Sequence, residues 1–115
     1  MGRPSLPNPQ CAVVDPAKVR DYLLSSEHPI GRYKATVFER AGYRRDRWEE
    51  LRNDLLQAAR LPASAAIATE FGQKLAVLAK LRTPTGLPLH VWVIWLVRNG
   101  EDFPRLVTAY PRRDA

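Results

Sequence analysis

The stretch from Leu89 to Tyr110, LHVWVIWLVRNGEDFPRLVTAY, decides the fold class. Residues 89–97 are almost continuously apolar, which predicts a central strand covered on both faces or nearly so. Asn99-Gly100 is a strong signal for a tight hairpin turn, and residues 103–110 have the composition of a returning strand. Because consecutive strands joined by short turns pair in opposite directions, the stretch predicts an antiparallel sheet.

The residues before this stretch extend the predicted sheet by one strand. Residues 69–82 alternate between apolar and polar, which places Lys74 and Lys80 on the face opposite the apolar side chains. A turn is expected over residues 83–86, and the small residues 63–68 predict a connector.

The first half of the chain has a helical period instead. Asp15-Pro16 predicts a helix start, with Asp15 as N-cap. A second helix is expected over Arg32–Arg40, stopped by Gly42. Asp46 is expected to cap a third helix, with Glu49 as its capping-box partner. The sequence therefore predicts an α+β fold, with three N-terminal helices followed by a three- to four-stranded antiparallel sheet.

The domain organisation follows from length and composition. The 115 residues suit one domain: an extended lead-in over residues 1–14, a single α+β domain over 15–111 and a basic tail over 112–115. No stretch is long enough to span a membrane and no secretory signal opens the chain. With one cysteine, no internal disulfide can form, and we expect a cytoplasmic protein.

The charge of the chain indicates an anionic partner. The net charge is +6, the pI is about 10.0, and 14 of the 18 basic residues are arginine. Arginine binds phosphates through a planar fork and stacks on bases, which favours a polyanion. Charge alone leaves two partner classes open, nucleic acid and an acidic protein.

The motif content favours metal-free chemistry. The sequence has no glycine-rich phosphate loop, no dinucleotide fingerprint and no paired-cysteine metal site, so we expect neither a cofactor nor a metal. The remaining histidine, lysine, arginine, tyrosine and threonine side chains suit phosphodiester cleavage, in which histidine transfers protons and cations hold the charge on the phosphate.

The segment HPIGRYK, residues 28–34, holds the main candidates. His28 is a candidate general base or acid, because histidine titrates near neutrality. Lys34 and Arg32 are candidates to bind the phosphate. The alternative is that His28 and Pro29 only cap a helix and shape a turn, and that Lys34 is a solvated surface residue.

The last strand carries the other catalytic candidates, Thr108 and Tyr110. Simple alternation places both on one face with Leu106, where their hydroxyls are suited to position a phosphate. The alternative is that this face packs on the helices. Arg105, a further phosphate-binding candidate, lies on the opposite face unless a bulge intervenes.

Four more basic residues are candidates for substrate binding. His90 opens the central strand and would pair with His28 if both pointed into one cleft. Its alternative role is that of a half-buried polar residue. Arg44, Arg45 and Arg47 either bind phosphate or form a solvated loop.

Three ordered strings in the chain resemble a small bacterial family of unknown function. They are AVVDPAKVRDYLLSSEHPIGRYKATVFERAGY, FGQKLAVLAKLRTPTG and VWVIWLVRNGEDFPRLVTAYP, and the resemblance extends from about Leu6 to Pro111. More loosely, helices before an antiparallel sheet, with His28 and Lys34 early and Thr108-x-Tyr110 late, resemble the superfamily of barnase, EndoU, nuclease colicins and RelE. That superfamily consists mostly of metal-independent ribonucleases, many of which are toxins.

Two functions from different classes follow. The resemblance implies a toxin-like ribonuclease that forms 2′,3′-cyclic phosphate ends and needs a small acidic antitoxin or immunity protein. The charge alone equally supports a non-catalytic binding module for nucleic acid or an acidic protein. A purely structural or phage-associated domain has no positive feature in the sequence.

Overall fold

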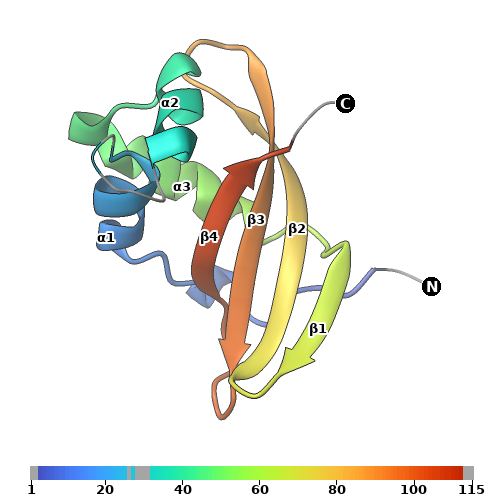
Figure 1. Cartoon of the computed structure of the whole chain (residues 1–115). Coiled ribbons are helices and arrows are strands. Elements are labelled where there is room, and N and C mark those ends of the chain that lie inside the picture. Colours follow the sequence, from blue (N-terminus) through green and yellow to red (C-terminus); the bar gives the residue numbers. More distant parts are fainter. Residues whose placement is uncertain (1–2, 26, 28–31, 113–115) are drawn as a thin grey trace.

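The computed structural model describes residues 3–25, 27 and 32–112 of the chain. Within these residues, helices come first and a four-stranded antiparallel sheet of order β1-β2-β3-β4 follows, so the predicted α+β class is confirmed. The helices lie together on one side of the sheet (Figure 1). The elements are η1 (Pro9–Cys11), α1 (Pro16–Lys18), η2 (Val19–Leu23), α2 (Arg32–Arg40), η3 (Arg45–Arg47), α3 (Trp48–Ala58), β1 (Ala65–Thr69), β2 (Gly72–Arg82), β3 (Pro88–Arg98) and β4 (Arg105–Pro111).

Two of the three predicted helix boundaries are confirmed. The Asp15 carboxylate accepts a hydrogen bond from the backbone N–H of Ala17 at 2.9 Å, and α2 has the predicted bounds. The capping box of Asp46 and Glu49 is wrong. The side chain of Arg44 donates to the Asp46 carboxylate at 3.0 Å, and Asp46 lies in the 3₁₀ turn η3, so α3 begins only at Trp48.

The hydrophobic core lies between the helices and the inner face of the sheet, which we define as the face that carries Val91, Val93 and Trp95. All three side chains are fully buried. Other fully buried core residues come from η2, α2, α3 and β2: Val19, Leu23, Phe38, Leu51, Leu55 and Val77. Burying a large apolar side chain contributes about 1.5–3 kcal/mol, so this contact is what holds the two layers together.

The expected connector over residues 63–68 is wrong, because it contains a strand. β1 pairs antiparallel with β2, with Ala65 opposite Ala76 and Thr69 opposite Gly72. Every residue of β1 is exposed, so it presents no buried apolar face from which alternation could have been read. Its backbone hydrogen bonds to β2 outweigh the poor strand propensity of alanine.

Gly72 allows the first residue of β2 to lie close to the backbone of β3. Its φ is +144°, and a Cβ at this position would lie 2.1 Å from the carbonyl oxygen of Val97. A larger residue would push β2 away from β3.

A bulge in β4 changes which side chains share a face. Leu106 pairs with Trp95 but Thr108 pairs with Ile94, so Val107 is an extra residue in the register. Leu106 therefore faces the core together with Ala109. The predicted grouping of Leu106 with Thr108 and Tyr110 is wrong, because strict alternation holds only without a bulge. Thr108 and Tyr110 do share the outer face of the sheet, the face opposite the core.

The segment before α1 packs on the domain. Leu6 and Val14 are buried. Val13 forms an isolated parallel bridge with Arg105, and its carbonyl accepts from the N–H of Leu106 at 2.9 Å. This bridge attaches the chain entering α1 to the start of β4.

Candidate functional site

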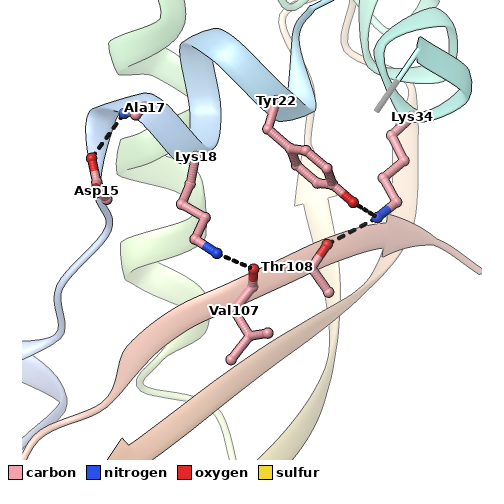
Figure 2. A pocket seen from close by; sticks show the side chains of 7 residues that line it. All are labelled: Asp15, Ala17, Lys18, Tyr22, Lys34, Val107 and Thr108. Atoms are coloured by element: carbon pink, nitrogen blue, oxygen red, sulfur yellow. Dashed lines mark hydrogen bonds between the residues drawn. The ribbon is translucent and has the colours of Figure 1, made fainter. Parts of the chain in front are cut away.

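Lys34 is the centre of a polar cluster built from three elements. Its ammonium donates to the Tyr22 hydroxyl at 2.7 Å and to Thr108 Oγ1 at 3.0 Å. It also lies 4.7 Å from the centroid of the Tyr22 ring. Figure 2 shows the three side chains converging from η2, α2 and β4. We call Lys34, Tyr22 and Thr108 the lysine cluster; Lys34 and Thr108 are among the candidates expected from the sequence.

Local backbone geometry places Tyr22 in this cluster. The turn that carries it is π-helical, and the N–H of Leu24 donates to the carbonyl of Val19 at 2.9 Å. A π turn has one more residue than an α turn, so it rotates the following side chains relative to an α-helical stripe. As a result Leu23 enters the core while Tyr22 remains half-buried and reaches Lys34.

Electrostatics make the Tyr22 phenol more acidic than an ordinary tyrosine. Burial alone would raise the pKa of Tyr22, but the hydrogen bond and positive charge of Lys34, together with Thr108 and Lys18, outweigh burial and lower it. A phenol with a lowered pKa gives up its proton more readily, so the cluster pairs a cation with a group capable of proton transfer.

A cavity of about 520 Å³ opens onto the lysine cluster. Figure 2 shows Lys18 on its other side, where the ammonium donates to the carbonyl of Val107 at 3.2 Å. The Asp15 carboxylate borders the cavity and caps the helix N-terminus. Two lysines against one carboxylate make this cavity suited to an anion.

A second cavity, of about 880 Å³, is also lined by Lys34. It is bordered by three aromatic residues and by apolar and basic ones: Tyr33, Lys34, Val37, Leu89, Trp92, Tyr110, Pro111 and Arg112. Thr108 and Tyr110 together also line a smaller hollow of about 270 Å³ on the outer face. The two hydroxyl residues of the last strand are therefore neighbours, while Tyr110 opens to a different cavity from the one that holds Tyr22.

The candidates in the segment 28–34 are described only in part. Lys34 lies in the first turn of α2, and its ammonium reaches Thr108 on β4. Arg32 is the first residue of α2, and its side chain lies outside the described part of the structure. His28 lies outside the described residues altogether.

Arg105 lies away from the lysine cluster. It pairs with Leu96 on the outer face, because the bulge shifts the register, yet it is three residues from Thr108, about 10 Å along a strand. Its guanidinium donates twice to the Glu101 carboxylate, both at 2.8 Å, and lies 5.0 Å from the Phe103 ring centroid. These contacts occupy the guanidinium at the hairpin end of β4.

The arginine segment, by which we mean Arg44, Arg45 and Arg47, is bound to carboxylates. Arg44 pairs with Asp46 at 3.0 Å, Arg45 with Asp21 at 3.0 Å and Arg47 with Glu50 at 3.8 Å. Arg45 also donates to the carbonyl of Arg20 at 3.1 Å. This pattern is that of a surface ion-pair network that joins η3 to η2.

His90 is half-buried in β3 opposite Lys80. Both cavities that contain Lys34 are bordered by other residues, with Leu89 and Trp92 contributed by β3. His90 therefore does not belong to the cluster around Lys34.

A family model matches nearly the whole chain. The model for a domain of unknown function, DUF6883, matches residues 5–113. The chain belongs to the DUF6883 family. No match was found among curated proteins.

Among solved structures, the DUF6883 chain is similar to a chain of a contact-dependent growth inhibition toxin–immunity protein complex from Klebsiella pneumoniae 342. The TM-score is 0.74 at 19% sequence identity, and the match covers 92% of this chain and 97% of that one. At this identity the likeness establishes a shared fold.

Two further observations concern the described part of the DUF6883 chain. No group of three or more histidine, cysteine, aspartate or glutamate side chains is placed there to hold a metal ion. No helix within it is both long and apolar enough to cross a membrane.

Sequence reasoning missed Tyr22 and Lys18 as site residues. Tyr22 follows Val19 at helical spacing, which favours a place on the apolar face of the first helix. The one available signal was its phenol, a polar group on an otherwise apolar stripe, because a half-buried tyrosine hydroxyl needs a partner. That partner is 12 residues away in Lys34, which only the packing of η2 against α2 reveals.

Proposed function

We propose that this domain is a metal-independent ribonuclease of the toxin type. The observation that carries the proposal is the lysine cluster: the Lys34 ammonium is held by two neutral hydroxyls at the border of two cavities. The overall charge of +6 favours an RNA substrate. The fold shared with a chain of a toxin–immunity protein complex is consistent with the proposal.

The proposed reaction is attack of a 2′-hydroxyl on the neighbouring phosphate. His28 removes the 2′-hydroxyl proton, the new bond from the 2′-oxygen to phosphorus forms, and the bond to the 5′-oxygen breaks. Tyr22 supplies the proton that the departing 5′-oxygen takes up, a role favoured by its lowered pKa. The products are a 2′,3′-cyclic phosphate and a 5′-hydroxyl end.

The other residues bind and orient the phosphate in this mechanism. Lys34 stabilises the negative charge that develops on the phosphate oxygens, because it lacks a carboxylate partner among the described residues. Thr108 Oγ1 on β4 accepts a hydrogen bond from the Lys34 ammonium and so orients it. Tyr110 and Arg32 bind phosphate and RNA next to Lys34 and Thr108. The arginine segment, Arg105 and His90 contribute less to RNA binding, through the overall positive field of the protein.

A toxin-like ribonuclease requires a neutralising partner. We expect a small acidic immunity protein or antitoxin that covers the cavity at Lys34, because a protein of net charge +6 attracts an acidic surface. Co-expression with such a protein is expected to restore growth and to remove RNA cleavage.

The test is induced expression in a bacterial host, with growth and total RNA followed together. The wild-type protein is expected to arrest growth and to fragment RNA. Cells that express Lys34→Ala or His28→Ala are expected to grow normally and to keep their RNA intact. Lys80→Ala is the matched control, because this exposed lysine lies in β2 and its loss removes the same charge. Undiminished toxicity of soluble His28→Ala and Lys34→Ala proteins would contradict the proposal.

The binding module is the second candidate, favoured by the many arginines on the surface. It predicts normal growth and intact RNA with a folded wild-type protein, together with RNA binding that weakens steeply as salt rises. Binding that survives loss of His28 and Lys34, but fails when the arginine segment is neutralised, would replace the ribonuclease proposal.

A further inference from the structure

The larger cavity beside Lys34 has the composition of a binding groove for a flat ring. Its volume of about 880 Å³ lies in the range of about 300–1,000 Å³ that is typical of small-ligand sites. Its lining residues come from α2, from β3 and from the end of β4, and α2 contacts β4. Tyr33, Trp92 and Tyr110 contribute its aromatic rings.

These aromatic side chains are not committed to the core. Tyr33 is 78% exposed and Tyr110 is 40% exposed, both high values for large apolar side chains. Trp92 and Tyr110 are direct partners in the β3–β4 register, and side chains opposite each other in an antiparallel pair have Cβ atoms about 4.5–5.5 Å apart. Their rings therefore border the groove side by side.

The cations around the groove favour a nucleotide over an apolar peptide. Lys34 borders this cavity and also the one that contains Tyr22 and Thr108. Arg112 also lines this cavity, and its backbone N–H donates to the carbonyl of His90 at 2.8 Å. A phosphate at Lys34 thus has an aromatic surface directly beside it, as in sites that bind single-stranded nucleic acid.

We infer that this groove is a nucleobase subsite, in which an unpaired base of single-stranded RNA stacks on Tyr33 and Tyr110 beside Trp92 while the adjoining phosphate binds Lys34. The inference rests on the proposed function, because both assign the phosphate to Lys34. It favours unpaired RNA as the substrate, since a base within a duplex must first be unpaired and unstacked before it can reach the groove.

The test uses two short single-stranded DNA probes of equal length, one with bases and one abasic. Neither has a 2′-hydroxyl, so neither can be cleaved by the proposed mechanism, and both carry the same phosphates. Measured by fluorescence anisotropy at one fixed salt concentration, the base-containing probe is expected to bind about tenfold more tightly to the full-length protein.

Matched variants test whether the tighter binding of the base-containing probe depends on the groove. Tyr33→Ala and Tyr110→Ala are expected to remove most of it, and Tyr110→Phe to retain it, because phenylalanine keeps the ring. Phe71→Ala is the control, since Phe71 is a 66% exposed aromatic residue in the β1–β2 turn, at the opposite end of the sheet from the groove (Figure 1). Circular dichroism verifies that each variant is folded.

The outcomes separate the subsite from the ribonuclease. Equal affinity for the two probes, or a base preference that survives loss of both tyrosine rings, would overturn the subsite even where wild type cleaves RNA. A folded wild type that binds neither probe would also overturn it and favour a protein partner in the groove. A base preference lost in the tyrosine variants, in a protein that leaves RNA intact, would support the subsite and refute the ribonuclease.

Discussion

The lysine cluster and the arginine segment are both basic, but their cations have different partners. Each of Arg44, Arg45 and Arg47 is paired with a carboxylate on the surface. Lys34 is instead hydrogen-bonded to the hydroxyls of Tyr22 and Thr108. Hydroxyls orient an ammonium without neutralising it, so the single lysine is better prepared to bind an anion than three arginines are. The number of cations in a segment is therefore a poor guide to an anion site.

Removal of Lys34 is expected to have the largest effect. Lys34→Ala should lower the rate of cleavage of single-stranded RNA by about 10²–10³-fold, the loss typical of one preorganised charge-stabilising group. The measurement is the initial rate with purified protein. A triple Arg44→Ala, Arg45→Ala, Arg47→Ala variant should remain within about tenfold of wild type, mainly through weaker electrostatic attraction. A larger loss of cleavage rate in the triple arginine variant than in Lys34→Ala would refute the claim that Lys34 is the more important anion-binding cation.

Tyr22→Phe is expected to lower the cleavage rate by about 10²-fold, because it removes the proposed proton donor. In the wild type, activity should decline with rising pH as Tyr22 loses its proton, at a pH below that of an ordinary tyrosine because its pKa is lowered. The part of the alkaline decline that is caused by Tyr22 should be absent from the residual activity of Tyr22→Phe. A pH–rate profile of both proteins measures this, and an unchanged alkaline limb in the variant would exclude Tyr22 as the acid.

Thr108→Val should reduce the cleavage rate by about tenfold, the equivalent of one lost hydrogen bond of about 1.4 kcal/mol. The substitution keeps the side-chain shape and removes the acceptor of the Lys34 ammonium. Thr108→Ser restores the hydroxyl and should recover most of the rate, as measured under single-turnover conditions. Equal activity of all three proteins would show that Thr108 does not position Lys34.

Asp21→Asn should cause the smallest change, and one of stability. Hydrogen bonds from Arg20 and then from Arg45 lower the pKa of Asp21 in the folded state. This stabilisation is present above the pKa of an unfolded aspartate, about 3.9, and is lost as the pH falls through the lower folded-state pKa. The variant should melt slightly below wild type at neutral pH, and the difference should shrink at acidic pH in thermal melts. Cleavage activity should not change.

The side chains that face the core could be predicted from the sequence for β2 but not for β4. Alternation over β2 places Leu75, Val77 and Ala79 on the face opposite Lys74 and Lys80, and all three are buried, because an uninterrupted strand keeps a period of two. In β4 the extra residue Val107 broke that period, and Leu106 moved to the core face. No sequence feature identified the bulge, since it depends on how β4 fits against β3 and the bridge from Val13.

The lysine cluster was only partly predictable for a related reason. The residue types point to Lys34 and Thr108, but the helical spacing of Tyr22 from Val19 favours a place on the apolar face of an α-helix. The π turn in η2 altered that stripe, and such turns arise where tertiary packing makes one extra residue per turn favourable.

By itself, the sequence determined the fold class, the helix over residues 32–40, the turns that follow β2 and β3, and a surface with excess positive charge. These features depend on local periodicity, turn residues and composition, which act over a few neighbouring positions. Only the tertiary structure decided which cations are neutralised, that β1 exists, and that Tyr22, Lys34 and Thr108 meet. Those outcomes depend on contacts between residues as many as 74 positions apart, and packing fixes such contacts only once the whole core has formed.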